Sequence, residues 1–362
     1  MPWSTALRRK LHTVLWIALA WSVISMTQLG YEAAILQEYS FSYRWSRPGA
    51  FMTYFTINTL AFVVNGLVAG AVIVFLLRPY IRYRSYTYGL LFGAGMYTLL
   101  FFLLTGVQNY FVVRSIWDGS GSFWTAYGKG LTDYFFSFEF VRNFPFWLLV
   151  LTATLAVLFV SDKYGPGGLR KFLLGRYFRP RSEERIFMFM DLKGSTTIAE
   201  QLGELRYFQF IQRVFQDVTP VLLETRGEIY QYVGDEVIVS WTVREGLQNL
   251  NCIRCFQEVK QHLEDLSPGY EKDFGVVPEF KAGLHVGRSI VGEIGVIKRD
   301  IAYSGDVLNT AARIQGKCNE LGAKLLVSED LARRLPTESL SLSPKGKVAL
   351  RGKAEAMELF GL

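Results

Sequence analysis

The sequence predicts a multi-span α-helical membrane domain over residues 1–161 and an α+β domain over residues 185–362, joined by residues 162–184. Half of the 362 residues are hydrophobic and 15% are aromatic, which is more than one soluble enzyme normally needs. The first part contains apolar stretches long enough to cross a bilayer, whereas short apolar runs alternate with helical patterns in the second. Together these observations predict a membrane-anchored protein with a folded domain outside the bilayer.

Four apolar stretches in the first part reach the length of about 20 residues that a membrane helix requires. They lie at about residues 11–29, 52–77, 87–112 and 144–161. Basic residues precede the first stretch, separate the second from the third and follow the fourth: Arg8, Arg9, Lys10; Arg78, Arg82, Arg84; Lys163, Arg170, Lys171, Arg176, Arg179 and Arg181. Because basic segments stay on the cytoplasmic side, this alternation predicts a multi-pass protein of the cell (inner) membrane, with its N-terminus and second domain in the cytoplasm.

The first stretch has the basic start and apolar run of a signal peptide, but residues 27–31 offer no small-residue cleavage site, so we interpret it as a span. His12 is the only histidine of this part, which excludes a paired-histidine haem site. The spans contain almost no acids, which argues against an ion relay. A sensor or a dimerising anchor remains. The outer connection with Asp118 and Trp124 could bind an unknown ligand or be an ordered loop.

The joint at residues 162–184 begins with the breaker cluster SDKYGPGG. Apolar residues then recur at helical spacing among basic ones: Leu169, Phe172, Leu173 and Phe178. This pattern favours an amphipathic helix that lies on the inner leaflet or pairs with its copy in a second chain, rather than a solvated linker.

The distribution of charge and the positions of the cysteines argue against nucleic-acid binding and against a zinc site. The net charge of +7 lies beside apolar segments and not in a basic stripe interleaved with aromatics, so we expect a lipid bilayer and no nucleic acid as partner. Cys252 and Cys255 fall inside a helical pattern without a second ligand pair, so we expect reduced thiols rather than a zinc site. We expect a structural role for His285.

Two carboxylates follow apolar runs in the second domain. The run Ile186–Met190 ends in Asp191, and the hairpin pattern EIYQYVGDEVIVSW carries Asp235 at its tip. Two acids at the ends of adjacent core strands are costly unless a cation lies between them. The pattern therefore predicts a pair of divalent cations holding a nucleoside triphosphate.

The remaining pattern alternates helices and strands. We predict a helix at Ile198–Thr225, a helix at about 243–266, strands near 279–286 and 289–295, a helix at 307–320 and a strand at 324–328. In the helix at 307–320, Asp306 has the position of an N-cap, and Asn309 and Arg313 are four apart and project from one face.

Four sequence blocks, in order, resemble the class III adenylyl and guanylyl cyclases, of a bacterial membrane-anchored type: FMDLKGST, YVGDEVIVSW, GLHVG and SGDVLNTAARI. The resemblance covers about residues 183 to 362. It implies a ferredoxin-like sheet with helices on one side. It also implies an adenylate cyclase that converts ATP into 3',5'-cyclic AMP and pyrophosphate with two Mg²⁺ or Mn²⁺ ions in each active site.

The resemblance also implies roles for single residues. Asp191 and Asp235 match the family's two metal aspartates, and we add the backbone carbonyl of Leu192 as a ligand. Asn309 would orient the ribose, and Arg313 would stabilise charge on the α-phosphate. The loop after Asp191 can present N–H groups to phosphates at the start of the next helix. We expect substrate contacts from Lys193, Gly194, Ser195, Thr196, Gln231, Ala302, Arg351 and Lys353.

Base selection departs from the family pattern. Adenylyl members usually carry Lys and then Asp or Thr at two positions, and guanylyl members carry Glu and Cys, whereas this chain has Gln231 and Ala302. The missing Glu and Cys favour ATP, and a guanylate cyclase is the alternative.

In this family the active site lies between two catalytic domains, so a chain with one such domain predicts a homodimer with two equivalent sites. Two further functions stay open: a catalytically silent nucleotide-sensing module, and a diguanylate cyclase or polymerase-like relative. The first would be signalled by loss of a metal Asp, Asn309 or Arg313, and the second usually carries a GGDEF-like hairpin.

Overall fold

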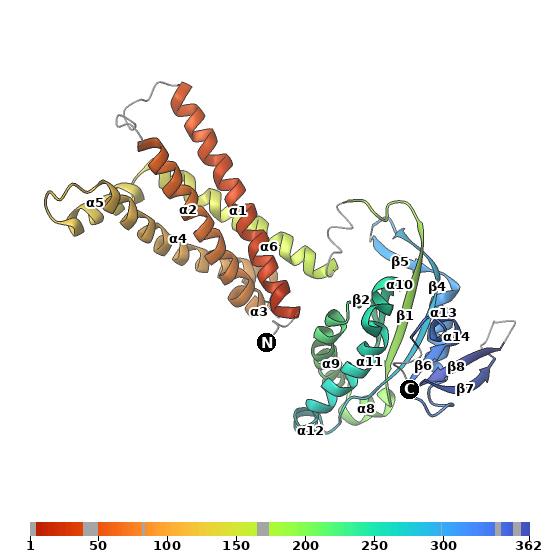
Figure 1. Ribbon diagram of the computed structural model, residues 1–362. Helices are drawn as coiled ribbons and strands as arrows, with labels where there is room; N and C mark the ends of the chain where they lie inside the picture. Colours follow the sequence, from red (N-terminus) through yellow and green to blue (C-terminus); the bar gives the residue numbers. More distant parts are fainter. Residues whose placement is uncertain are drawn as a thin grey trace. The chain divides into compact units, whose positions relative to one another are not determined.

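The computed structural model of the protein describes residues 5–38, 50–81, 84–164, 174–297, 299–336, 342–349 and 356–362. The chain divides into two compact units, Met1–Val160 and Ser161–Leu362 (Figure 1).

The first unit is helical. Its elements are α1 (Thr5–Glu38), α2 (Ala50–Ala71), the π-helical segment η2 (Val72–Leu77), α3 (Arg78–Ile81), α4 (Tyr86–Ile116), α5 (Phe123–Phe135) and α6 (Phe138–Tyr164). Within the described residues, four stretches are long and apolar enough to cross a membrane: Lys10–Tyr31, Thr59–Ile81, Thr87–Ser115 and Phe138–Asp162. These candidate stretches overlap the four predicted spans. The connection that we predicted to lie outside contains α5, a helix that the sequence pattern did not indicate.

Small residues and polar contacts hold these helices together. A Cβ atom on Gly66 or Gly70 would lie 3.1 Å from backbone atoms of α1, so the two glycines, four residues apart, let α2 approach α1 closely. Between α1 and α6, Trp21 Nε1 donates to Thr154 Oγ1 at 3.0 Å. In a nonpolar environment without water, such interhelical hydrogen bonds satisfy polar side chains.

The joint differs from its prediction where it is described. Residues 165–173 of the predicted amphipathic helix lie outside the described residues. From Leu174 to Pro180 the chain forms turns, because Gly175 has a positive φ of 59° that ends helical geometry. Tyr177 is buried, and its carbonyl accepts a hydrogen bond from the Glu293 N–H at 3.0 Å, which ties this segment to the sheet.

The second unit is a mixed sheet with helices. Its elements are β1 (Arg181–Leu192), α8 (Ser195–Leu202), α9 (Glu204–Glu224), β2 (Glu228–Val233), β3 (Glu236–Thr242), α10 (Val243–Leu247), η3 (Gln248–Leu250), α11 (Asn251–Asp265), α12 (Ser267–Phe274), β4 (Phe280–Ile294), β5 (Asp300–Ser304), α13 (Asp306–Gly316), β6 (Leu325–Ser328), α14 (Glu329–Ala332), β7 (Ser343–Val348) and β8 (Met357–Gly361). The strand order is β2-β3-β1-β4-β6-β8-β7, and β5 pairs with β4. The central strand β1 runs antiparallel to both β3 and β4.

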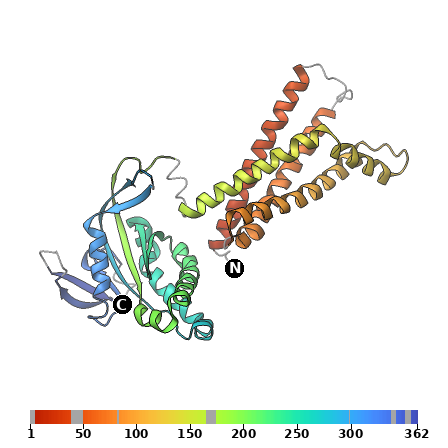
Figure 2. The ribbon, with the colours of Figure 1, turned by 180° about the vertical axis from the view of Figure 1, so that it is seen from behind.

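Helices cover both faces of the sheet, so the prediction of helices on one side is wrong. Side chains alternate along β1. Ile186, Met188 and Met190 pack into the larger core with α9 and α11, whereas Phe187 and Phe189 pack against α13. In Figures 1 and 2, α9 and α11 accordingly lie on the opposite side of β1 from α13.

Glycines and turns account for the other differences from prediction. The predicted helix at Ile198–Thr225 is broken into α8 and α9 at Gly203, which has a φ of 73°. The helix at about 243–266 is interrupted where Asn249 and Leu250 have positive φ. The strands near 279–286 and 289–295 form one strand, β4, and the helix at 307–320 ends at Gly316. Strands β7 and β8 were not predicted.

Two smaller expectations agree with the structure. Cys252 and Cys255 are buried free thiols of α11. His285 is buried, and its Nδ1 lies 2.8 Å from Ser328 Oγ, which fits a structural role.

Candidate active site

Asp191 lies at the end of β1, on the sheet face that α13 covers. In the strand register it lies opposite Glu236 of β3 and Lys281 of β4. Its Oδ2 lies 3.3 Å from Lys281 Nζ and accepts a hydrogen bond of 3.1 Å from Gln315 Nε2 on α13. Gln315 reaches it because α13 lies directly on β4 at Gly283, where a Cβ atom would be 2.3 Å from the Gln315 backbone nitrogen.

Asp235 lies beside Asp191 in the two-residue turn between β2 and β3, which Gly234 makes with a φ of 63°. Its Oδ2 is buried and has no hydrogen-bond partner within the described part of the chain. Burial and then the charge of Asp235 raise the pKa of Asp191, and Lys281 opposes this shift. Burial, Asp191 and Asp235 raise the pKa of Glu236 to about 7. Negative charge therefore exceeds the positive charge available here.

This arrangement fits divalent cations. A cation between the two aspartates would satisfy the orphaned Asp235 oxygen and relieve the repulsion that raises the pKa of Asp191. No group of three or more His, Cys, Asp or Glu that could hold a metal is found among the described residues. Two carboxylates leave coordination positions for phosphate oxygens, water and a carbonyl such as that of Leu192, which suits Mg²⁺ or Mn²⁺.

The loop after Asp191 leads directly into α8. Gly194 has a φ of 70° and precedes the first helical residue, Ser195, so the N–H groups of Ser195 and Thr196 lie at the helix N-terminus, where the dipole favours an anion. Lys193 is held elsewhere: its Nζ lies 2.9 Å from Glu279 Oε2, and its N–H donates to the Glu279 carbonyl at 2.7 Å. The loop thus offers backbone donors, while the Lys193 side chain is tied to Glu279.

Asn309 and Arg313 lie on the outer side of α13. The opposite side of the helix is buried against the sheet and includes Val307, Ala311 and Gln315. Asn309 is exposed and Arg313 half-buried, and the Arg313 side chain has no ion pair or hydrogen bond among the described residues. One chain therefore places Asp191 and Arg313 on different sides of α13.

Asp306 is not the N-cap that we predicted, and two expected substrate contacts lie outside the described residues. The helix N-cap is Gly305, and Asp306 is the first helical residue, whose Oδ2 accepts a hydrogen bond from Thr310 at 3.4 Å. Arg351 and Lys353 lie outside the described residues.

The positions predicted to read the base lie on separate strands. Gln231 is exposed on β2, and Ala302 lies on β5, so β3, β1 and β4 intervene in the sheet. Their neighbours do meet: the rings of Tyr230 and Tyr303 are 5.1 Å apart and perpendicular. These tyrosines and Phe187 form an aromatic patch on the face of α13.

The family model of the adenylate and guanylate cyclase catalytic domain matches residues 179–362. The chain belongs to this family. Its match with adenylate cyclase 2 of Rhizobium meliloti (strain 1021) is 36% identical over 207 residues, 57% of this chain and 57% of that protein. A match with the adenylate cyclase of Anabaena cylindrica is 25% identical over 222 residues, 56% of this chain and 41% of that protein. The chain thus spans about half the length of these relatives.

A solved structure agrees with the fold. The structure of a bacterial light-regulated adenylyl cyclase superposes with a TM-score of 0.51 and 22% identity, over 62% of this chain and 65% of that one. This likeness supports the class III cyclase fold of the second unit.

Sequence reasoning missed several residues of this cyclase site. Lys281 and Gln315 contact Asp191, and Glu236 is its neighbour across the strand pair. Tyr207 of α9 lies near Ser195, and burial followed by the charge of Asp235 raises its pKa. Glu236 could have been found because it follows Asp235 directly, but only strand pairing and helix packing bring the others to the site.

Proposed function

We propose that the protein is a membrane-bound adenylate cyclase that converts ATP into 3',5'-cyclic AMP and pyrophosphate. The observation that carries this proposal is the Asp191 and Asp235 pair, with its orphaned oxygen, in a domain of the cyclase family. A relative named adenylate cyclase, 36% identical, supports ATP rather than GTP as substrate. Gln231 is compatible with this choice because an amide can both donate to and accept from a base edge.

The reaction joins the ribose 3' oxygen to the α-phosphorus, breaks the bond to pyrophosphate and releases the hydroxyl proton. When bound, two cations would supply the Lewis acidity that activates the hydroxyl and would hold the triphosphate. Asp191 and Asp235 would hold these cations, and the N–H groups that begin α8 would bind phosphate oxygens. Asn309 orients the ribose, and Arg313 stabilises the charge that grows on the α-phosphate.

We propose a homodimer, because a single chain keeps the two aspartates apart from Asn309 and Arg313. Gln315 turns one side of α13 toward Asp191, while Asn309 and Arg313 project from the other side. A two-fold symmetric pair can bring Arg313 of each chain to Asp191 of the other, which makes two equivalent sites. The first unit, with its four candidate spans, would anchor or regulate this pair from the cell membrane.

The test uses the full chain in lipid nanodiscs with ATP or GTP and Mg²⁺ or Mn²⁺, and quantifies cyclic nucleotides by mass. We expect cyclic AMP from ATP, reduced at least about a thousandfold by Asp235→Ala because metal stabilisation of the transition state is lost. Glu200→Ala, which changes an exposed acid of α8, is the matched control and should be fully active.

Other outcomes contradict parts of the proposal. Cyclic GMP as the main product would identify a guanylate cyclase. A folded, dimeric protein that yields no cyclic nucleotide would contradict an enzyme and favour a nucleotide-sensing module.

A further inference from the structure

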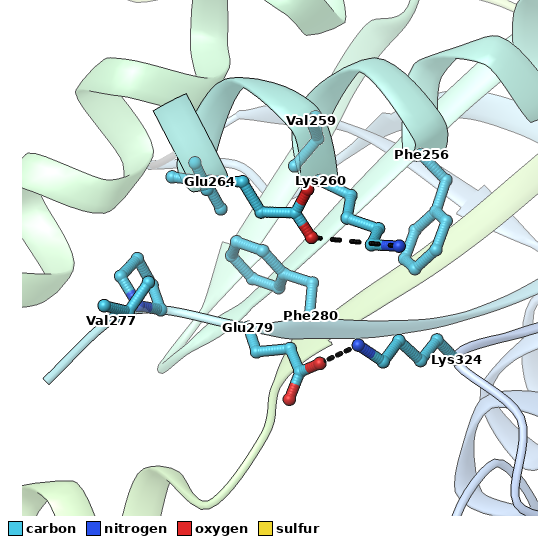
Figure 3. A pocket seen from close by; sticks show the side chains of 10 residues that line it. Phe256, Val259, Lys260, Glu264, Val277, Glu279, Phe280 and Lys324 are labelled. Atoms are coloured by element: carbon cyan, nitrogen blue, oxygen red, sulfur yellow. Dashed lines mark ion pairs between the residues drawn. The ribbon is translucent and has the colours of Figure 1, made fainter. Parts of the chain in front are cut away.

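A cavity of about 240 Å³ lies between α11 and the start of β4 (Figure 3). Its walls combine apolar side chains, among them Phe256, Val259 and Phe280, with two lysines, Lys260 of α11 and Lys324, which directly precedes β6. In the close-up the Phe280 ring lies between the Lys260–Glu264 and Lys324–Glu279 ion pairs, and the Phe256 ring lies beside Lys260. Small-molecule sites likewise combine apolar walls with a few polar groups, and the volume of this cavity suits a compact ligand.

The charged side chains at the rim differ in how many hydrogen bonds they can still make to a ligand. Glu279 already accepts from both Lys324 and Lys193, and these contacts lower its pKa. Lys260 has only a loose contact of 3.8 Å with Glu264, and both side chains are about half exposed. An ammonium group has three donors, so Lys260 and Lys324 keep donors to spare.

We propose that this cavity binds a small amphipathic carboxylate, whose apolar body lies against Phe256 and Phe280 and whose carboxylate is held by Lys260 and Lys324. An anion fits better than a cation, because Glu279 is already satisfied by two ammonium groups and the half-exposed Glu264 is paired with Lys260, whereas both lysines keep unused donors. If Lys324 turns to the ligand, Glu279 still keeps Lys193. If Lys260 also turns to the ligand, Glu264 is about half exposed and can be solvated by water.

The cavity is linked to the active-site loop through Glu279. The same residue lines the cavity, pairs with Lys193 through its side chain and accepts the Lys193 N–H through its carbonyl. A ligand that takes Lys324 leaves the Glu279 charge to Lys193 alone and so holds the start of the phosphate-binding loop more firmly. This link rests on the proposed cyclase function, whereas the binding does not.

Binding is tested on the full chain in nanodiscs by saturation-transfer NMR with 3-phenylpropionate as probe, and with 3-phenylpropanol as its uncharged match. We expect a saturable signal for the carboxylate that exceeds the signal from empty nanodiscs. Its Kd should be about 1 mM, as the small size of the probe allows. The double variant Lys260→Gln and Lys324→Gln should weaken binding at least tenfold. Lys347→Gln, which removes an exposed lysine of β7, should not. Equal binding by the double variant, or equal binding of the alcohol, would overturn the proposal.

The link is tested by cyclase kinetics with the same probe. We expect the probe to lower the KM for ATP by about two- to fivefold, the range that one exposed ion pair can supply. Glu279→Gln should keep probe binding and lose this effect. Binding without any change in KM would refute the link, and absence of cyclic nucleotide from every protein would contradict the cyclase function while the NMR result still stands.

Discussion

The two sides of α13 are built for different tasks. One side is buried against the sheet, where Val307 and Ala311 pack on Phe187 and Phe189 and Gln315 reaches Asp191. The other side carries Asn309 and Arg313, and Arg313 has no ion pair in the described residues. In the proposed function, the first side would complete the chain's own metal site, whereas the second would offer a cation and an amide to a second copy. The difference teaches that the two sides of one helix face different surroundings, and this is why we propose that a single copy holds two half sites.

The strongest test of this comparison mixes two inactive chains. Arg313→Ala should lower kcat by about a hundred- to a thousandfold, because a positioned charge on the transition state is lost. Asp191→Ala should be at least as harmful. Co-expressed, the two variants should regain up to roughly a quarter of wild-type activity, since half of the dimers are mixed and each mixed dimer has one intact site of two. No recovery, although each variant dimerises, would contradict the shared site.

The close approach of α13 to the sheet can be broken at Gly283. Gly283→Ala should destabilise this region by about 3 kcal/mol, because the added Cβ would lie 2.3 Å from the Gln315 backbone. Gly316→Ala is the matched control: a Cβ there meets no atom within 4 Å, so stability should hold or rise slightly. Hydrogen exchange of β4 and α13 peptides measures both variants, and similar protection in the two would show that the contact is not required.

The contact of the buried side with Asp191 can be removed alone. Gln315→Leu should weaken Mn²⁺ binding by about tenfold, as expected when a hydrogen bond that orients a metal ligand is lost. Titration of Mn²⁺ by electron paramagnetic resonance measures this affinity. Gln261→Leu, on the exposed side of α11, is the control. Unchanged affinity in Gln315→Leu would mean that Lys281 and the backbone position Asp191 without it.

A further expected effect concerns pH. Because the folded chain raises the pKa of Glu236 from 4.5 to about 7, folding favours the protonated form, so the metal-free protein should lose stability as pH rises from about 4.5 to 7. Calorimetry of the metal-free protein in EDTA measures this dependence. The unfolding transition to follow is the one that moves when Mn²⁺ is added in a separate scan without EDTA. Glu236→Gln should flatten it. An equal slope in both proteins would place the titrating group elsewhere.

Local patterns predicted the strand and the hairpin that carry the two aspartates. An apolar run followed by Asp191 predicted a strand that ends at the site, and Gly234 with Asp235 predicted the hairpin tip, because strand burial and turn geometry are written in neighbouring residues. The four candidate spans followed from length and composition alone. Breaks at Gly203 and at Asn249 were missed, because a periodic apolar face continues across a single residue with positive φ.

The sequence by itself determined the two carboxylates, the shared face of Asn309 and Arg313, and the membership of the cyclase family. Tertiary structure alone decided that α13 lies on the face opposite α9 and α11, and that Lys281 and Gln315 contact Asp191. The physical reason is range. Helical periodicity indicates which residues share a side of a helix. Which face of the sheet the helix covers depends on contacts between residues more than a hundred positions apart, such as Asp191 and Gln315.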